Sequence, residues 1–240
     1  MRIGDRSYQA DATGIHVSIT GGQQAWAVAD GIGDGPLPAY AAGSAASVAS
    51  YVAAERGSVA GLLAATDALS GLAYEDTVLV VATPLPDDKG GGWDVAWVGD
   101  CRAYEYRPEH DLLAQLTLDH TRGQDLRRSL ASRYEGRLDE LEKLAGPHDR
   151  VVMSSVGSAT ESTIGHVATF GPRRRLLLTS DGVHKAVPRR SIARAARLFG
   201  DPRTCAHKLT VAAQYFGGTD NAAAMVIDPL PGHDGVGLAQ

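Results

Sequence analysis

Four aspartates stand beside predicted strands, where acidic side chains can work together: Asp11, Asp30, Asp181 and Asp220. Asp30 lies in Val-Ala-Asp-Gly, Asp181 lies in Thr-Ser-Asp-Gly, and Asp220 precedes an asparagine. Carboxylates at strand ends can converge from distant parts of a sequence on one rigid site. A glycine directly after the acid lets a backbone carbonyl or a substrate approach without interference from a Cβ atom.

Clustered carboxylates repel one another unless a cation compensates them. A hard divalent ion such as Mg²⁺ or Mn²⁺ suits this role because it takes oxygen ligands and retains waters, whereas the histidine-poor surroundings of these aspartates disfavour zinc. Two such ions can hold a bridging water, lower its pKa and offset charge on phosphoryl oxygens. Taken singly, each Asp-Gly pair is usually a turn, so spacing alone leaves open whether these aspartates meet.

Composition excludes several other classes of protein. The 240 residues, 44% of them hydrophobic, suffice for one core, and a net charge of -5 argues against nucleic acid as the partner. No apolar run is long enough to span a membrane, and Arg2, Asp5 and Arg6 occupy the place of an apolar signal segment. Cys101 and Cys205 lie too far apart in sequence for a CxxC motif. We expect a soluble, cytoplasmic monomer.

The predicted elements form an α+β layer fold. Small-residue and leucine patterns predict helices over 38–56 and 58–73, with Gly57 as the stop between them. The three glycines in 87–92 predict a hairpin, and hence antiparallel pairing. Short runs rich in leucine and β-branched residues predict strands over 26–29, 77–83, 94–98, 102–106, 112–118, 175–179 and 223–227.

Two segments differ in composition from the rest. Residues 121–145 alternate in charge and carry regularly spaced leucines, which predicts an amphipathic, partly exposed helical insert. Residues 229–240 lack apolar periodicity and are expected to form a flexible tail. Residues 1–228 are therefore expected to be a single domain.

Six segments, read in order across residues 4–228, resemble the successive motifs of the type 2C (PPM) metal-dependent protein phosphatases of the compact bacterial kind. The resemblance implies two antiparallel β-sheets packed as a sandwich flanked by α-helices, with a dinuclear site in a channel at one end. It places the charged insert in the flap region of these enzymes. The segments are Arg6-Ser-Tyr-Gln-Ala-Asp11, Val28-Ala-Asp-Gly-Ile-Gly33, Val98-Gly-Asp-Cys-Arg-Ala-Tyr104, Leu116-Thr-Leu-Asp-His-Thr121, Leu177-Leu-Thr-Ser-Asp-Gly-Val183 and Asp220-Asn221.

The resemblance also implies a role for each acid. Asp30 would bridge two Mg²⁺ or Mn²⁺ ions, and the carbonyl of Gly31 would bind the second ion. Asp181 and Asp220 would bind the first, while Asp11 would act through metal-bound water.

Two further residues match motif positions of the family. Asp100 matches an aspartate that helps bind a third, weaker metal ion together with Asp181; the alternative is an acid that orders a turn. Arg6 matches the arginine that grips the substrate phosphate, a role that suits the paired donors of a guanidinium. The alternative for Arg6 is an ordinary exposed arginine. Asp11, Asp30 and Arg6 form the implied catalytic set.

The sequence departs from the family pattern at several positions. Ala10 stands where an acid or amide is usual, which would lower affinity for the second metal ion. Ile32 stands where animal relatives have histidine, and it cannot protonate a leaving group. His120 is interpreted as a residue that orders a turn. Cys101 replaces a common serine and is interpreted as a packing substitution.

The implied activity is hydrolysis of phosphoserine and phosphothreonine, with phosphoproteins, a serine/threonine kinase and its substrates as partners. A second hypothesis is a regulator that binds phosphoprotein but turns over little, motivated by Ala10 and the loop at Ile32. A third is a phosphatase of anti-sigma-factor antagonists. Because such relatives often carry regulatory domains, a stand-alone catalytic chain fits the kinase partnership better, by family analogy.

Overall fold

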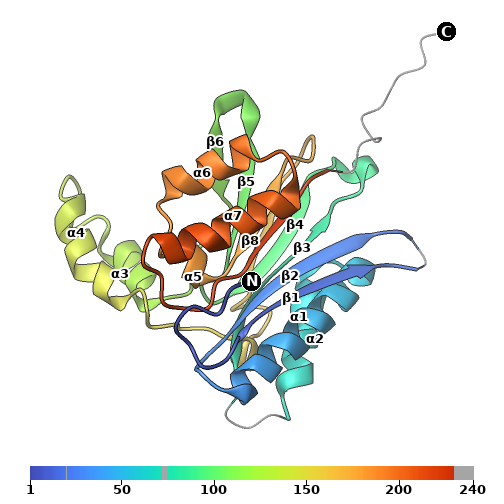
Figure 1. Cartoon of the computed structure of the whole chain (residues 1–240), viewed down its shortest axis with the longest axis horizontal. Coiled ribbons are helices and arrows are strands. Elements are labelled where there is room, and N and C mark those ends of the chain that lie inside the picture. The colour runs from blue at the N-terminus through green and yellow to red at the C-terminus, as the bar shows by residue number, and fades with distance from the viewer. Residues whose placement is uncertain (20, 72–74, 230–240) are drawn as a thin grey trace.

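The computed structural model describes residues 1–19, 21–71 and 75–229. Two antiparallel sheets face each other and helices cover both outer faces (Figure 1). The first sheet has the order β1 (Asp11–Val17), β2 (Gln24–Gly31), β3 (Thr77–Pro84), β4 (Trp93–Val98) and β7 (Gly165–Ala168). The second has the order β6 (Leu112–Gln115), β5 (Arg102–Arg107), β8 (Leu176–Thr179) and β9 (Ala224–Ile227). The predicted α+β sandwich is confirmed.

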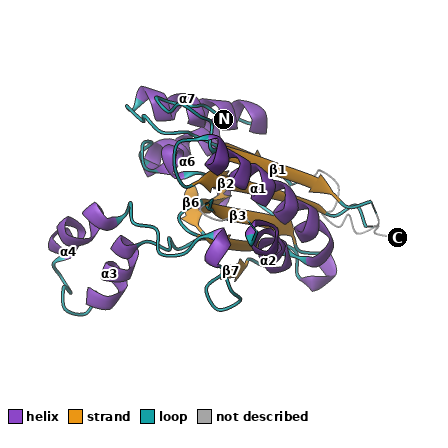
Figure 2. Ribbon diagram, turned by 90° about the horizontal axis from the view of Figure 1, so that it is seen from below, coloured by secondary structure: helices purple, strands orange, loops and turns teal. Residues whose placement is uncertain are grey.

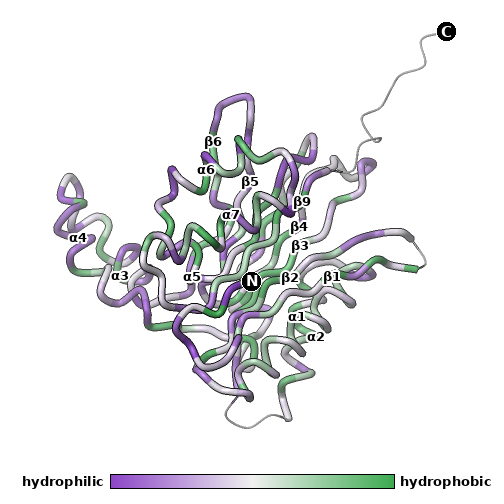
Figure 3. Tube along the Cα trace, in the orientation of Figure 1, coloured by the Kyte–Doolittle hydropathy of each residue, from purple (hydrophilic) through white to green (hydrophobic). Residues whose placement is uncertain are grey.

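The central strand β3 shows why the sequence folds into layers. Every residue from Thr77 to Thr83 is buried, because alternate side chains of a strand point to opposite faces and both faces of β3 are covered. Val78 and Val80 pack between the two sheets, whereas Leu79 and Val81 pack under the helices. Figure 3 shows these central strands as the hydrophobic part of the trace.

Two helices cover the outer face of the first sheet: α1 (Pro36–Arg56) and α2 (Ser58–Leu69). The buried face of α1 consists almost entirely of alanines, so its backbone approaches the sheet closely. A Cβ atom on Gly14 would lie 2.1 Å from the carbonyl oxygen of Ala46. The predicted stop at Gly57 is confirmed, and its φ of 89° is one that glycine adopts readily.

Three helices cover the second sheet: α5 (Asp181–His184), α6 (Arg189–Leu198) and α7 (Pro202–Tyr215). Neither α6 nor α7 was predicted from the sequence. Each buries only one large apolar residue, Ile192 in α6 and Leu209 in α7, beside smaller ones, so the apolar periodicity that marks a helix is weak. The strands β1 and β7 also escaped prediction, since β1 contains Gly14 and lies at a sheet edge.

The hairpin predicted at 87–92 is confirmed between β3 and β4, which pair antiparallel. It contains the short 3-10 helix η1 (Asp87–Lys89), and Gly90, Gly91 and Gly92 all have positive φ. The strand predicted to run to residue 118 is shorter, because β6 ends at Gln115. Beyond it, the carbonyl of Leu118 accepts a hydrogen bond from the indole of Trp97, 2.8 Å, instead of a strand partner.

The charged insert forms two helices, α3 (Arg122–Leu130) and α4 (Leu138–Ala145), which project from the body of the molecule (Figure 2). Thr121 and Val152 pair as an isolated β-bridge, so both ends of the insert leave from one root. The guanidinium of Arg127 on α3 binds Glu142 on α4 and Asp149 beyond it, at 2.6–2.9 Å. This ion-pair cluster holds the two helices together.

Three more 3-10 helices complete the described chain: η2 (Pro108–His110), η3 (Gly146–His148) and η4 (Val156–Ser158). Within residues 1–19, 21–71 and 75–229, no helix combines the length and apolar character needed to cross a membrane. The tail predicted from residue 229 lies, apart from its first residue, outside the described chain.

Candidate active site

A pocket of about 650 Å³ opens at the end of the sandwich where β2 and β8 finish and β1 and β9 begin. Six of the seven residues singled out from the sequence line it, and the seventh, Asp11, is buried and accepts a hydrogen bond from Ser180 beside Asp181. The six are Arg6, Asp30, Gly31, Asp100, Asp181 and Asp220. Spacing left their meeting open, and the fold brings them together.

Asp11 and Asp30 stand directly opposite each other in the β1–β2 pair. Like charges in this arrangement repel. Asp11 is 3% exposed, and its Oδ2 accepts a hydrogen bond from the Ser180 hydroxyl at 2.7 Å, whereas its Oδ1 has no hydrogen-bond partner among the described residues. The pKa of Asp11 is raised to about 7, mainly by burial and then by the charges of Asp181 and Asp220, against the lowering effect of the Ser180 hydrogen bond.

The charged form of Asp30 is also strongly disfavoured. Burial raises its pKa well above the ordinary value, and the charges of Asp181 and Asp11 add to this. Its backbone is fixed, because Thr77 on β3 donates its hydroxyl to the Asp30 carbonyl at 2.7 Å. Asp30 belongs to the first sheet and Asp181 follows the second, so carboxylates of both sheets meet across the end of the sandwich.

The glycines that follow Asp30 and Asp181 permit a close backbone approach, as expected from the sequence. A Cβ atom on Gly31 would lie 2.4 Å from the Pro38 carbonyl oxygen, and one on Gly182 would lie 1.8 Å from that of Asn221. In both cases the approaching group belongs to the protein itself. At Gly182 this contact sets the position of the segment that carries Asp220.

Gly182→Ala is therefore expected to destabilise the fold by about 1–3 kcal/mol, as overpacking does, and to weaken divalent-ion binding by moving Asp220. Urea unfolding and a Mn²⁺ titration measure the two effects. Gly43→Ala is the matched control, since a Cβ atom there meets nothing within 4 Å on the exposed face of α1. That change should be neutral or stabilising, and a similar result at Gly182 would contradict the packing argument.

Asn221 locks three segments around the pocket. Its side chain accepts a hydrogen bond from the Ala10 amide and donates one to the Ile3 carbonyl, both at 2.7 Å. The Ala10 carbonyl in turn accepts from the Gly31 amide at 3.0 Å. Ala10 is thus buried with both backbone groups bonded, and the motif Asp220-Asn221 has a positioning role that the sequence did not reveal.

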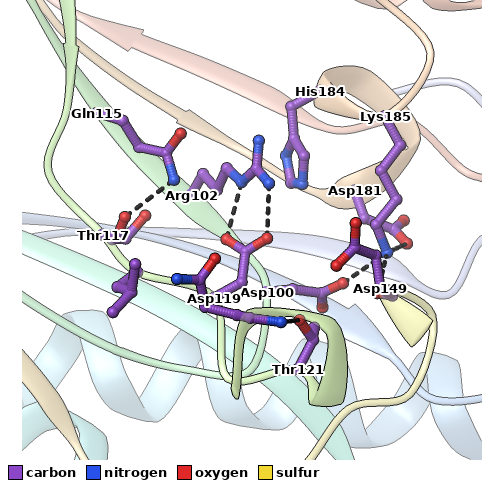
Figure 4. Close-up of polar contacts among 12 residues, drawn as sticks. Asp100, Arg102, Gln115, Thr117, Asp119, Thr121, Asp149, Asp181, His184 and Lys185 are labelled. Carbon is purple, nitrogen blue, oxygen red and sulfur yellow. Dashed lines mark hydrogen bonds and ion pairs between the residues drawn. The ribbon is translucent and has the colours of Figure 1, made fainter. Parts of the chain in front are cut away.

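Two cations are paired with the pocket carboxylates. Arg6 Nη2 lies 2.8 Å from Asp220 Oδ2. Lys185 Nζ lies 2.7 Å from Asp100 Oδ2 and 2.9 Å from Asp181 Oδ2 (Figure 4). Burial raises the pKa of Asp100, and the neighbouring Lys185 opposes that rise.

Three residues of this region were not assigned a role from the sequence: Lys185, Arg150 and Ser180. A signal existed for Lys185, because it lies four residues after Asp181, and side chains at that spacing on a helix are neighbours. No comparable signal existed for Arg150 beyond its place after the insert. Ser180 stood inside a quoted motif without an assigned role.

His120 and Cys101 have structural roles. His120 lies against Trp97, with ring centroids 6.0 Å apart, and burial lowers its pKa. The fully buried Cys101 thiol has its pKa raised well above the ordinary value, first by burial and then by the charge of Asp30, which suits packing rather than redox chemistry. Ile32 lines the pocket and offers no proton.

The donor set fits hard divalent cations, although in the described part of the chain no three His, Cys, Asp or Glu side chains form a ready-made metal cage. Mg²⁺ usually takes one or two carboxylates and completes its shell with water, so a cage is not required. The unpartnered Oδ1 of Asp11 and the raised pKa values of Asp11 and Asp30 indicate negative charge that Arg6 and Lys185 do not neutralise.

This excess charge predicts a pH-dependent stability difference in the absence of divalent ions. Folded Asp11 keeps its proton up to about pH 7, whereas unfolded Asp11 loses it near the ordinary pKa of 3.8. The folded state then binds more protons between these values, so its stability falls as pH rises. Asp11→Asn removes this cost, and its advantage over wild type should grow between pH 4 and 7 to about 2–4 kcal/mol, at roughly 1.4 kcal/mol per pKa unit.

Urea unfolding in chelator at pH 4.5 and 7.5 measures this difference. Asp34→Asn is the control of opposite sign, because amide hydrogen bonds from Ser7 and Tyr8 lower the Asp34 pKa. That substitution should cost stability at neutral pH and lose its effect as pH falls. An Asp11→Asn protein no more stable than wild type at pH 7.5 would contradict the charge argument.

This architecture is similar to that of several solved structures. No protein-family model and no curated protein sequence matches the chain. The PPM Ser-Thr phosphatase MsPP from Mycobacterium smegmatis, in complex with cacodylate, is 25% identical with a TM-score of 0.75, covering 95% of both chains. Stp1 from Staphylococcus aureus is 19% identical, TM-score 0.74, covering 95% of this chain and 92% of its own.

The catalytic domain of the serine/threonine phosphatase PstP, in complex with two manganese ions, is 21% identical with a TM-score of 0.69. The match covers 95% of this chain and 96% of that one. These similarities agree with the two-sheet topology. Over 95% of its length, the chain has the fold of the bacterial PPM serine/threonine phosphatases.

Proposed function

We propose that this chain is a Mg²⁺- or Mn²⁺-dependent phosphatase of the PPM family that hydrolyses phosphoserine and phosphothreonine in proteins. The observation that carries the proposal is the convergence of four carboxylates from both sheets on a pocket that Arg6 also lines. A cluster with uncompensated negative charge is unsuited to bind a phosphate by itself. With divalent cations added, the same cluster becomes a phosphate site.

In this proposal, Asp30, the Gly31 carbonyl, Asp181 and Asp220 would hold two divalent cations. Bound there, the cations would supply a water of lowered pKa and offset charge on the phosphate. Arg6 would bind phosphate oxygens through its guanidinium. Asp11 would orient water through its free Oδ1 while Ser180 fixes its Oδ2.

We also propose that residues 1–228 act as one phosphatase domain with 121–145 as its flap. Arg150, which lines the pocket, follows directly after Asp149, the residue that Arg127 ties to the insert. The insert root thus reaches the pocket edge, where it would contact the residues that flank a phosphorylated side chain. The partners that this function implies are phosphoproteins, together with a serine/threonine kinase and its substrates.

A phosphatase assay on a phosphothreonine peptide and on a small aryl phosphate tests the function, with Mn²⁺, Mg²⁺ and chelator in parallel. We expect hydrolysis of both substrates with either metal and none with chelator. An Asp181→Asn preparation controls for contaminating phosphatases and should be nearly inactive. Equal hydrolysis with and without chelator would contradict the metal assignment.

One observation favours a second candidate, a regulator that binds phosphoprotein with little turnover. Asp181 and Asp220, the acids assigned to the first ion, are already paired with Lys185 and Arg6. Calorimetry separates the two functions. Phosphopeptide affinity without divalent-ion binding would support the regulator, whereas tight binding of divalent ions would support the enzyme.

A further inference from the structure

The Lys185 ammonium lies where three oxygen acceptors from separate segments converge. Asp100 Oδ2, at 2.7 Å, comes from the turn between β4 and β5. Asp181 Oδ2, at 2.9 Å, comes from the start of α5, and the Asp149 carbonyl, at 3.3 Å, comes from the insert root. Figure 4 shows Lys185 reaching toward these groups.

This arrangement is built into the fold and is not a surface pair. The Asp100 side chain is 4% exposed and that of Lys185 is 31% exposed. The backbone fixes Lys185 as well, since its amide donates to the Asp181 carbonyl at 2.8 Å. Asp149 is held from its other side, because Arg127 binds both of its carboxylate oxygens at 2.6 and 2.7 Å.

The oxygen atoms that accept hydrogen bonds from this ammonium are of the kind that a divalent cation takes as ligands. Two carboxylates and a carbonyl are hard oxygen ligands, and the sequence resemblance implied a third metal ion at Asp100 and Asp181. A cation entering there would meet a positive charge already seated on the same oxygens. The lysine is tethered to the chain, so its presence does not depend on the ion concentration in solution.

We infer that Lys185 is a built-in cation that takes the place of the third metal ion, so the protein takes up two divalent ions and not three. Asp100 then serves as the counter-ion of Lys185 and not as a metal ligand. The inference rests on the proposed function, because it presumes that the other carboxylates bind two ions. It also ties the first-ion ligand Asp181 to the insert root through one side chain.

Counting bound Mn²⁺ tests the inference. Free Mn²⁺ is followed by its paramagnetic resonance signal during titration of the intact protein, for wild type, Lys185→Ala, Lys185→Arg and Lys208→Ala. Lys208 is exposed on α7, away from the pocket lining, and is the matched control. We expect two bound ions for wild type, Lys185→Arg and Lys208→Ala.

Lys185→Ala should bind a third, weaker ion, and adding Asp100→Asn to it should return the count to two. Three ions on wild type, or two on a folded Lys185→Ala protein, would overturn the inference. If Lys185→Ala does not fold, Lys185→Met keeps the alkyl stem without the charge and takes its place. If the wild-type protein binds no ion and shows no turnover, both the proposed function and this inference are wrong. Intact turnover with three ions would end the inference alone.

Discussion

Asp30→Asn is expected to lower kcat on the order of a thousandfold while making the metal-free protein more stable. Asp30 is the acid assigned to both ions, so the neutral amide removes a ligand from each. In the metal-free fold the same carboxylate is a liability, because burial and the charges of Asp181 and Asp11 raise its pKa well above the ordinary value. At neutral pH a group with a raised carboxyl pKa destabilises the folded state, and the amide removes that penalty.

Steady-state kinetics in Mn²⁺ and urea unfolding in chelator measure the two effects on one pair of proteins. Asp67→Asn, on the exposed side of α2, is the control and should change neither quantity. A residual activity above about a tenth of wild type would remove Asp30 from the metal site. A metal-free Asp30→Asn protein less stable than wild type would show instead that the carboxylate supports the fold.

Opposite effects on activity and stability are what separate a functional cluster from a structural one. A carboxylate kept for stability is paired, and its loss weakens the fold. Asp11 has an unpartnered oxygen, and Asp30 sits across from it in the register of β1 and β2. The fold therefore carries a local cost that divalent-ion binding would relieve, since any ligand that binds only the folded state stabilises it.

The layers of the fold could be predicted from the sequence where the local residue patterns were strong. The strand at Thr77–Pro84 is buried on both faces, and its β-branched run marked it clearly. Gly57 and the glycines of the β3–β4 hairpin marked turns because their positive φ angles suit glycine. Where a short helix buries few large apolar residues, as α6 buries Ile192 beside two alanines, or where a strand lies at an edge, as with β1, the same signals were weak.

The candidate site could be predicted from the sequence only in part, for a different reason. The motifs identified the acids, but the contacts that make them a site join residues far apart in the chain. Ser180 bonds Asp11 across 169 positions, and Asn221 bonds Ala10 across 211. Such contacts depend on how the two sheets face each other, and no local pattern encodes that.

Lys185 shows that local patterns also fail to predict some contacts between residues close in the sequence. Its spacing from Asp181 was visible in the sequence, yet spacing alone describes an ordinary pair on a helix surface. The pair acquires its meaning from the buried Asp100, which the turn between β4 and β5 brings to the same ammonium. The family motifs had placed a metal ion there, and only the three-dimensional arrangement shows a side chain of the protein occupying those oxygens.

Arg6→Ala is expected to lower kcat/KM for a phosphothreonine peptide by about 10- to 100-fold, the range for losing charge-assisted hydrogen bonds to phosphate. The same change should strengthen Mn²⁺ binding, because Arg6 Nη2 pairs with Asp220 Oδ2 at 2.8 Å and competes with a cation for that oxygen. Arg6→Lys should recover part of the activity, since an ammonium keeps the charge but lacks the fork. Unfolding free energy should change little, as the pair is exposed.

Kinetics at saturating Mn²⁺ and a separate Mn²⁺ titration keep these effects apart. Arg194→Ala, on the exposed face of α6, is the control for loss of a positive charge and should leave both measurements at wild-type values. If Arg6 only orders the N-terminal segment, Arg6→Ala would weaken substrate and Mn²⁺ binding together, and Arg6→Lys would rescue neither. Opposite changes in the two affinities identify Arg6 as a group that alternates between Asp220 and a substrate phosphate, because only a shared guanidinium links a loss at one to a gain at the other.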